Sequence, residues 1–138
     1  MPKAIYVNLP VADLPRAMAF FTAIGFGFDP QFTDAQAAAL RISDTIHAML
    51  HTEASFRRFT HKEIADARRS TEVLLALQVE SRAAVDALLA RALHAGGREP
   101  RAAEDYGFMY GRAFEDPDAH IWEVFWMDPA QMADAASG

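Results

Sequence analysis

The same pattern occurs in both halves of this chain of 138 residues, and it limits the folds that the chain can adopt. Apolar residues alternate over 5–11 and again over 73–79, as they do in a strand with one buried face. Each stretch is followed by a residue suited to cap a helix, Asp13 or Ser81, and then by apolar residues at helical spacing. A pattern repeated in this way indicates an internal duplication and predicts two similar units.

Three short strands are predicted after each helix, separated by turns that contain Asp, Pro, Ser and Gly. They are expected at 26–28, 37–42 and 45–50 in the first half, and at 108–110, 113–115 and 121–126 in the second. Each half therefore has the order β-α-β-β-β, and the fold class is α+β. We expect a single domain over residues 1–138, with halves at 1–51 and 71–130 and a tail at 131–138.

The polar stretch at 52–70 separates the two halves. Short helices are expected in it near Phe56 and Ile64. A connection of this length is uncommon inside a compact domain, so it is either a link between the halves or a lid over a site.

Charge and composition exclude several classes of partner. The net charge is -6 and there is no basic block, so we expect no nucleic-acid partner. We also expect no membrane partner, because no apolar run is long enough to span a bilayer. The chain has no cysteine and no apolar signal core, which makes the cytoplasm the expected compartment.

Glu123 lies in the most apolar of the predicted strands, which covers 121–126. Alternation places it on one face with Ile121 and Phe125, opposite the face that carries Trp122. A carboxylate among large apolar neighbours is costly unless it has a partner or faces a pocket. The sequence therefore predicts one or the other at Glu123.

Three motifs resemble a known superfamily. A Val-x-Asp-Leu run begins at Val11, the first helix ends in Ile-Gly-Phe, and Asp-Pro-Asp-x-His-x-x-Glu ends at Glu123. With the two β-α-β-β-β units, they resemble the vicinal oxygen chelate superfamily, which includes glyoxalase I, bleomycin- and fosfomycin-resistance proteins and extradiol dioxygenases. Longer runs are similar to a bacterial branch often labelled lactoylglutathione lyase-like; they lie at 7–11, 30–34, 62–67, 70–77 and 105–112. The resemblance implies a cupped mixed sheet, the glyoxalase/bleomycin-resistance fold.

The resemblance also implies where metal ligands would lie, one on the first strand and one on the last strand of each half. These positions hold Tyr6 and Met49 in the first half, and Leu74 and Glu123 in the second. Only Glu123 is an ordinary ligand for the hard or borderline ions of such folds. We therefore expect no metal in the usual place and no other cofactor. The alternative is a lactoylglutathione lyase-like enzyme or a dioxygenase with a rearranged metal site that uses His51, Glu123 and Tyr6.

The expected function is the binding of a small organic ligand in the cupped sheet, where a few polar groups among apolar ones are typical of ligand sites. The candidate ligand-binding residues are Asn8, Met49, His51, Leu74, Gln78 and Arg112. Arg112 has two interpretations, since its planar guanidinium could clamp an anionic ligand or pair with an acid of the protein. If the protein is an enzyme, Glu123 is the candidate base and Tyr6 or Tyr110 the proton donor. A protein that sequesters its ligand without catalysis is a third possibility.

Two further expectations concern assembly and backbone. Folds of the resembled kind usually pair, so we expect a homodimer, with Trp126 and the segment 127–130 as candidates for the contact. Relatives usually carry Gly where this chain has Ala119. The turn after Asp118 is therefore predicted to hold Ala119 at positive φ.

Overall fold

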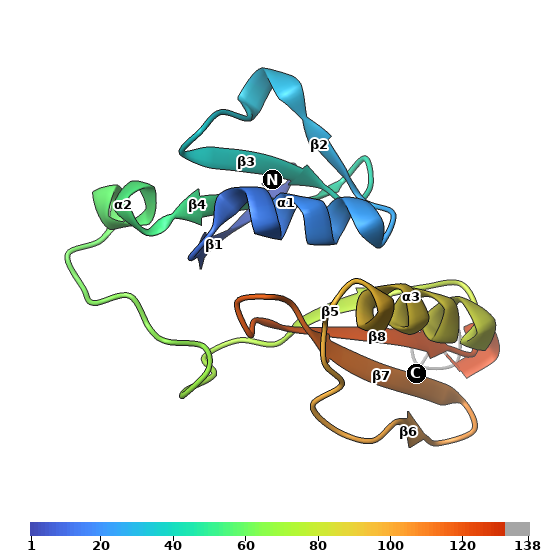
Figure 1. Ribbon diagram of the computed structural model, residues 1–138. Coiled ribbons are helices and arrows are strands. Elements are labelled where there is room, and N and C mark those ends of the chain that lie inside the picture. Colours follow the sequence, from blue (N-terminus) through green and yellow to red (C-terminus); the bar gives the residue numbers. More distant parts are fainter. Residues whose placement is uncertain (132–138) are drawn as a thin grey trace. The chain divides into compact units, whose positions relative to one another are not determined.

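The computed structural model describes residues 1–131. The chain forms two compact units, one over Met1–Ser70 and the other from Thr71 onward (Figure 1). Among the described residues, no helix has the length and the hydrophobicity needed to cross a membrane. The part of the expected tail at 132–138 lies outside the described residues.

The first unit is a four-stranded sheet with one long helix. Its elements are β1 (Ile5–Val11), α1 (Leu14–Ala23), β2 (Gly27–Asp29), the 3₁₀ helix η1 (Pro30–Phe32), β3 (Ala37–Arg41), β4 (Ile46–Thr52), α2 (Glu53–Phe56) and the 3₁₀ helix η2 (Arg57–Phe59). The strand order is β1-β4-β3-β2. The first and last strands, β1 and β4, are parallel, and the other pairs are antiparallel.

The second unit repeats this topology. Its elements are β5 (Leu75–Gln78), α3 (Arg82–His94), β6 (Glu104–Asp105), β7 (Met109–Glu115) and β8 (Ile121–Met127). The strand order is β5-β8-β7-β6, again with the first and last strands parallel. The α+β class and the two β-α-β-β-β units are therefore confirmed.

Both long helices begin and end where the sequence predicts. The Asp13 carboxylate accepts the backbone N–H of Arg16 at 3.0 Å, and the Ser81 hydroxyl accepts that of Ala84 at 3.0 Å. Each helix is followed within two residues of its C-cap by a glycine at positive φ, 103° at Gly25 and 104° at Gly96. A side chain would strain this backbone, so glycine ends each helix.

One face of each sheet packs against its long helix. In the first unit Leu9 and Leu50 are buried with Phe21 of α1. In the second unit Trp122 and Val124 are buried with Leu89 of α3. Because side chains alternate along a strand, residues of the opposite parity lie on the other face, away from the helix. That other face carries most of the candidate site residues.

Two predictions in the irregular regions are wrong. A helix forms near Phe56 as expected, but the chain near Ile64 has no helix. The two strands predicted at 108–110 and 113–115 are a single strand, β7, which continues through Gly111. Gly111 pairs directly with Phe125 in the ladder, so it causes no break.

The turn before β8 is organised by a buried carboxylate. Asp116 accepts the backbone N–H of Asp118 at 2.9 Å and of His120 at 3.1 Å, and the indole N–H of Trp122 at 3.0 Å. Ala119 has φ of 66°, which confirms the predicted positive φ. The turn before β8 is thus hydrogen-bonded to Trp122, a core residue of β8 itself.

Candidate functional site

Four predicted site residues of the first unit lie together on one face of its sheet. In the parallel pairing of β1 and β4, Asn8 lies beside Met49, and Tyr6 lies one step along the same face. His51 is on this face as well, beside Pro10. These residues are opposite in parity to the buried Leu9 and Leu50, so they face away from α1.

A pocket of about 350 Å³ opens on this face. Its lining residues are Tyr6, Asp29, Phe32, Ala39, Arg41, His47 and Met49. The rings of Tyr6 and His47 stack at 4.8 Å between centroids, with 16° between their planes. Ala39 pairs directly with Met49 on the next strand, and its small side chain leaves space above the sheet. The pocket therefore has aromatic and thioether walls with few polar groups.

Phe32 reaches this pocket from η1. Asp29 accepts the backbone N–H of Gln31 at 3.0 Å, and Pro30 occupies the first turn of η1, where its missing N–H costs nothing. Phe32, Arg41 and His47 were not among the site residues predicted from the sequence. His47 could have been predicted from strand parity, because it lies two residues before Met49 on β4 and therefore shares its face.

His51 and Asn8 are engaged with each other. The Asn8 amide donates to the carbonyl of Tyr6 at 3.1 Å, so its oxygen accepts from Nε2 of His51, at 2.7 Å. Nδ1 of His51 then accepts from the Ser55 hydroxyl at 2.9 Å. Burial lowers the pKa of His51, and the nearby Arg58 charge lowers it further. His51 is thus a neutral residue that joins β4 to β1 and α2, with both ring nitrogens in use.

The sequence predicts a partner or a pocket at Glu123, and the carboxylate of Glu123 pairs with Arg101. Arg101 lies in the irregular segment before β6, where neither periodicity nor a motif identifies it. Glu123 is flanked on its neighbouring strands by Ala76 and Ala113, which leave room around the carboxylate. A second pocket, of about 200 Å³, includes Arg101 and Glu123 in its lining.

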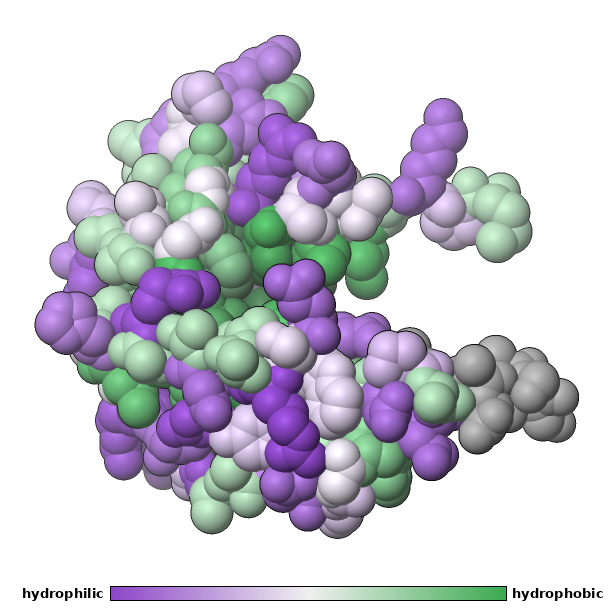
Figure 2. Space-filling view, turned by 90° about the vertical axis from the view of Figure 1, so that its right-hand side faces the viewer, coloured by the Kyte–Doolittle hydropathy of each residue, from purple (hydrophilic) through white to green (hydrophobic). Residues whose placement is uncertain are grey.

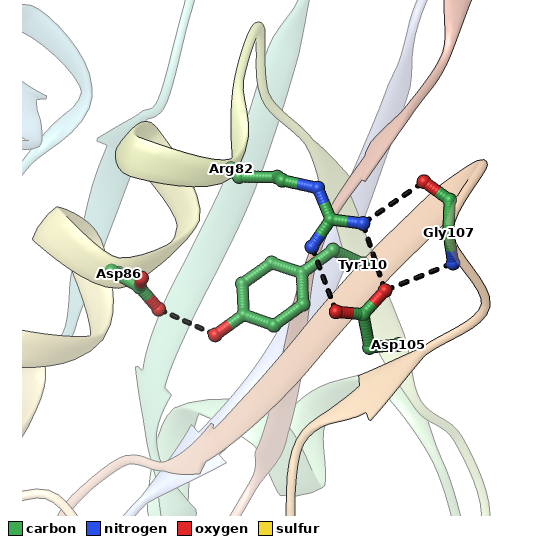
Figure 3. Close-up of polar contacts among 5 residues, drawn as sticks. All are labelled: Arg82, Asp86, Asp105, Gly107 and Tyr110. Carbon is green, nitrogen blue, oxygen red and sulfur yellow. Dashed lines mark hydrogen bonds and ion pairs between the residues drawn. The ribbon is translucent and has the colours of Figure 1, made fainter.

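Tyr110 and Arg112 lie on the other face of the second sheet. In the β7–β8 ladder Glu123 pairs with Ala113, so Tyr110, three residues earlier, has the opposite parity. The Tyr110 hydroxyl donates to Asp86 of α3 at 2.6 Å (Figure 3). Tyr110 is therefore not placed to donate a proton at a site built on Glu123.

Arg112 is held by two acids of the protein. It donates from Nε and one terminal nitrogen to the two oxygens of Glu99, at 2.9 and 2.8 Å, and from its other nitrogen to Asp86 at 2.9 Å. These bonds raise the pKa of Arg112 and lower the pKa of Glu99. The planar fork is occupied, which supports the structural interpretation of Arg112.

Arg82 completes this network on the α3 side of the sheet. It donates to both oxygens of Asp105, at 2.9 and 2.8 Å, and to the carbonyl of Gly107 at 2.9 Å (Figure 3). Its guanidinium also lies over the rings of Tyr110 and Trp126, at 5.1 and 5.2 Å from their centroids. The pKa of Asp105 falls to about 2, chiefly through Arg82. These contacts fasten the β6–β7 hairpin to α3.

The two remaining ligand-binding candidates are exposed. Leu74 precedes β5 and is 54 % exposed. Gln78 ends β5 and shares the face of Glu123, beside Phe125. Neither Leu74 nor Gln78 lines either of these two pockets.

The positions that the resemblance assigns to metal ligands do not fit a metal. In the first unit Tyr6 stacks on His47 and Met49 offers only a thioether. In the second unit Leu74 has no donor atom and Glu123 is paired with Arg101. Over residues 1–131, no three or more His, Cys, Asp or Glu side chains gather as a metal site would require. No step of a reaction is therefore assigned to a metal.

The repeated β-α-β-β-β fold, with pockets on its sheets, can be compared with known protein families. The chain belongs to the Glyoxalase/Bleomycin resistance protein/Dioxygenase superfamily, whose family model matches residues 3–124. Among curated proteins, none matches the chain.

Solved structures of similar fold include several members of this superfamily. A hypothetical protein from S. aureus, SA1046, is 25% identical, with a TM-score of 0.77 over 91% of this chain and 95% of its own. A glyoxalase-related enzyme from Fulvimarina pelagi is 24% identical, with a TM-score of 0.74 over 91% of this chain and 88% of its own. A lactoylglutathione lyase from Agrobacterium tumefaciens is 17% identical, with a TM-score of 0.68 over 91% of this chain and 94% of its own. At such identities the last two show the fold alone.

Proposed function

We propose that the protein binds a small organic ligand on the open face of its sheet, without a metal at the family's usual position. The pocket on the first sheet is the observation that carries this proposal. Its volume of about 350 Å³ falls in the range of small-molecule sites, which are mostly apolar with a few polar groups.

The walls of this pocket favour a ligand with a flat ring. Tyr6 and Phe32 are 54 % and 62 % exposed, although burial of aromatic rings is favourable. The stacked pair of Tyr6 and His47 offers a flat surface with a polar edge. Arg41, which also lines the pocket, pairs with the exposed Asp44 at 2.5 Å. A ring with one small polar substituent would match these groups.

Tyr6 is the residue whose loss tests the pocket. We expect Tyr6→Ala to weaken binding of a ring-containing ligand found by fragment screening at least about fivefold, since stacking contributes roughly 1 kcal/mol. Tyr106→Ala, which removes an exposed tyrosine of the second unit, is the matched control and should leave the affinity unchanged. Equal affinity in wild type and Tyr6→Ala would contradict the proposal.

The absence of the usual metal is tested separately. We expect the untagged protein to contain well under one equivalent of zinc, nickel, iron or manganese, and its melting temperature to be insensitive to a chelator. Stoichiometric metal that is lost in Glu123→Gln would restore the lactoylglutathione lyase-like or dioxygenase alternative.

If the protein is an enzyme, its own side chains supply the candidate base and the candidate proton donor. Glu123 is the candidate base, and Arg101 beside it supplies a positive charge. Tyr6, in the first unit, is the candidate proton donor, whereas Tyr110 is committed to Asp86. Turnover against a panel of small carbonyl compounds separates an enzyme from a protein that sequesters its ligand.

We further propose a cytoplasmic homodimer. Ile5, on the strand that ends the order of the first sheet, is 71 % exposed, and a second copy would cover such a position. Trp126 is partly committed to Arg82, so the segment after it is the better candidate for the contact. On the face shown in Figure 2, hydrophilic residues are interspersed among hydrophobic ones, so this face gives no support for a large apolar interface. A monomer at micromolar concentration in ultracentrifugation would contradict the dimer.

A further inference from the structure

The pocket of the second unit is lined by one glycine, Gly111, and by apolar and charged side chains that include Glu123. Glu123 projects from β8 between Ala76 of β5 and Ala113 of β7. Next to them Gly111 lies opposite Phe125. A Cβ atom at Gly111 would lie 3.6 Å from Cβ of Phe125 and 3.7 Å from the sulfur of Met109, so a larger side chain would fill the floor of the pocket.

The walls of this pocket are apolar apart from a few charged groups. Met109, Phe125 and Met127 line it together with the charged residues. Phe125 and the two thioethers can pack against a ring or a short alkyl group. The pocket thus combines an apolar wall with a few charged groups, among them Glu123, which is typical of sites for small organic molecules.

The charged residues that line this pocket are two arginines and two glutamates, but Arg112 also pairs with acids outside the lining, so carboxylates outnumber guanidinium groups in these ion pairs. Arg101 is shared by two carboxylates, since it pairs with Glu123 and also with Glu104, at 3.3 Å. Arg112, the other lining cation, is already held by Glu99 and Asp86. An anionic ligand would add a further negative charge beside Glu104 and Glu123, whereas a cation would balance this excess of carboxylates.

Arg101 has the features of a cation that can be displaced. It reaches Glu123 from an irregular segment, with one terminal nitrogen, and its side chain is 36% exposed. Glu123 lies on the inner strand β8 and its side chain is 27% exposed. Partly exposed pairs of this kind contribute little net stability, so a competing cation meets little resistance.

We propose that Arg101 is an internal counter-ion for Glu123, and that an organic monocation with a small apolar ring binds this pocket by displacing it. The ammonium or amidinium group of the ligand takes the place of the guanidinium on Glu123. Its ring packs against Phe125 and Met127. The lining of this pocket shares no residue with that of the pocket on the first sheet, and the proposal does not depend on the function proposed there.

Benzamidine and benzoate are matched probes for this proposal, since they share ring and size but differ in charge. In spectra of ¹³C-methyl methionine, benzamidine should shift the signals of Met109 and Met127, whether or not the signal of Met49 in the first pocket moves. Benzoate should shift neither Met109 nor Met127. The proposal is overturned if benzamidine leaves Met109 and Met127 unmoved, or if benzoate moves them equally. A failure of the function proposed for the first sheet is detected separately, by equal ligand affinity in wild type and Tyr6→Ala.

Substitution of Arg101 distinguishes two roles for this residue. It either competes with the ligand for Glu123 or orients Glu123 for the ligand. Arg101→Ala should tighten benzamidine binding about threefold to fivefold, because the competitor is gone. Arg101→Gln should do the same while keeping most of the side-chain length. Unchanged or weaker binding in both variants would show that Arg101 orients Glu123 for the ligand, and it would overturn the proposal.

Two further variants complete the test. Glu123→Gln should weaken benzamidine binding at least fivefold, since it removes the charge and keeps the shape. Arg41→Ala makes the same change in net charge as Arg101→Ala but in the first unit, so it controls for the overall field of the protein. Tightening in Arg41→Ala equal to that in Arg101→Ala would overturn the proposal. Backbone amide spectra of each variant check that both units remain folded.

Discussion

The two units of this protein have the same strand order, yet their open faces have diverged into pockets of different chemistry. Met49 of the first unit corresponds to Glu123 of the second. Met49 pairs with Asn8 and Glu123 with Ala76, and these two residues lie at the same distance before the helix caps Asp13 and Ser81. Around Met49 the walls are aromatic and apolar; around Glu123 they include ion pairs. The residues buried against the helix are apolar in both units, although in the second unit this face also carries the ion pairs of Arg112 at its margin. The comparison shows that the core constrained divergence and the open face did not.

The turns that lead into the last strands differ most, and they give the largest expected effect. Asp116→Ala should lower the free energy of unfolding by about 3 kcal/mol, because three N–H donors, including that of the buried Trp122, lose their acceptor. Ser43→Ala, in the corresponding turn of the first unit, should cost under about 1 kcal/mol, since its bonds to Thr45 and Ile46 are exposed. Urea denaturation compares the two. Equal losses would show that the turns are energetically equivalent.

Exchange of the central residues tests whether each pocket accepts the chemistry of the other. Met49→Glu should cost about 1–2 kcal/mol, because a carboxylate would lie between Asn8 and Ala39 without a dedicated partner. Glu123→Met should cost less than about 1 kcal/mol, since it breaks only a partly exposed pair with Arg101. The same denaturation experiment gives both values. A larger loss in Glu123→Met would mean that the ion pair stabilises the fold more than its exposure suggests.

His51 gives the first unit a pH dependence that the second lacks at the equivalent position, which is Phe125. Its folded-state pKa is lowered, chiefly by burial, from an unfolded value of about 6.5. The unfolded chain therefore binds the proton more readily. Its contribution to stability is complete above pH 6.5 and is lost as the pH falls through the folded-state pKa. In His51→Phe, the decrease in the free energy of unfolding that His51 causes below pH 6.5 should disappear. If the dependence of this free energy on pH is unchanged, other groups cause it.

The smallest expected effect concerns the strained turn of the second unit. Ala119→Gly should stabilise the protein by up to about 1 kcal/mol, because glycine adopts the φ of 66° without the steric cost that alanine has. Thermal melting measures the change. A lower melting temperature would show that the buried methyl group of Ala119 is worth more than the strain it causes.

Several parts of the candidate site followed from strand parity in the sequence. Alternation placed Tyr6 and Asn8 on one face of their strand, the resemblance implied that Met49 lies on the same side, and the ladder between β1 and β4 has all three there. The need of Glu123 for a partner or a pocket also followed from its apolar neighbours. The identity of that partner did not, because Arg101 lies in a segment without periodicity, 22 residues away.

Local pattern determined the secondary structure of this protein and the fold built from it. The caps at Asp13 and Ser81, the glycines after each helix and the alternation within strands depend on neighbours in the chain, so the sequence specifies them. Tertiary structure decided which groups are free to act. Arg112 is occupied by Glu99, His51 by Asn8 and Ser55, and Tyr110 by Asp86. Side-chain pairing over long separations depends on how strands and helices pack, and no local pattern encodes it.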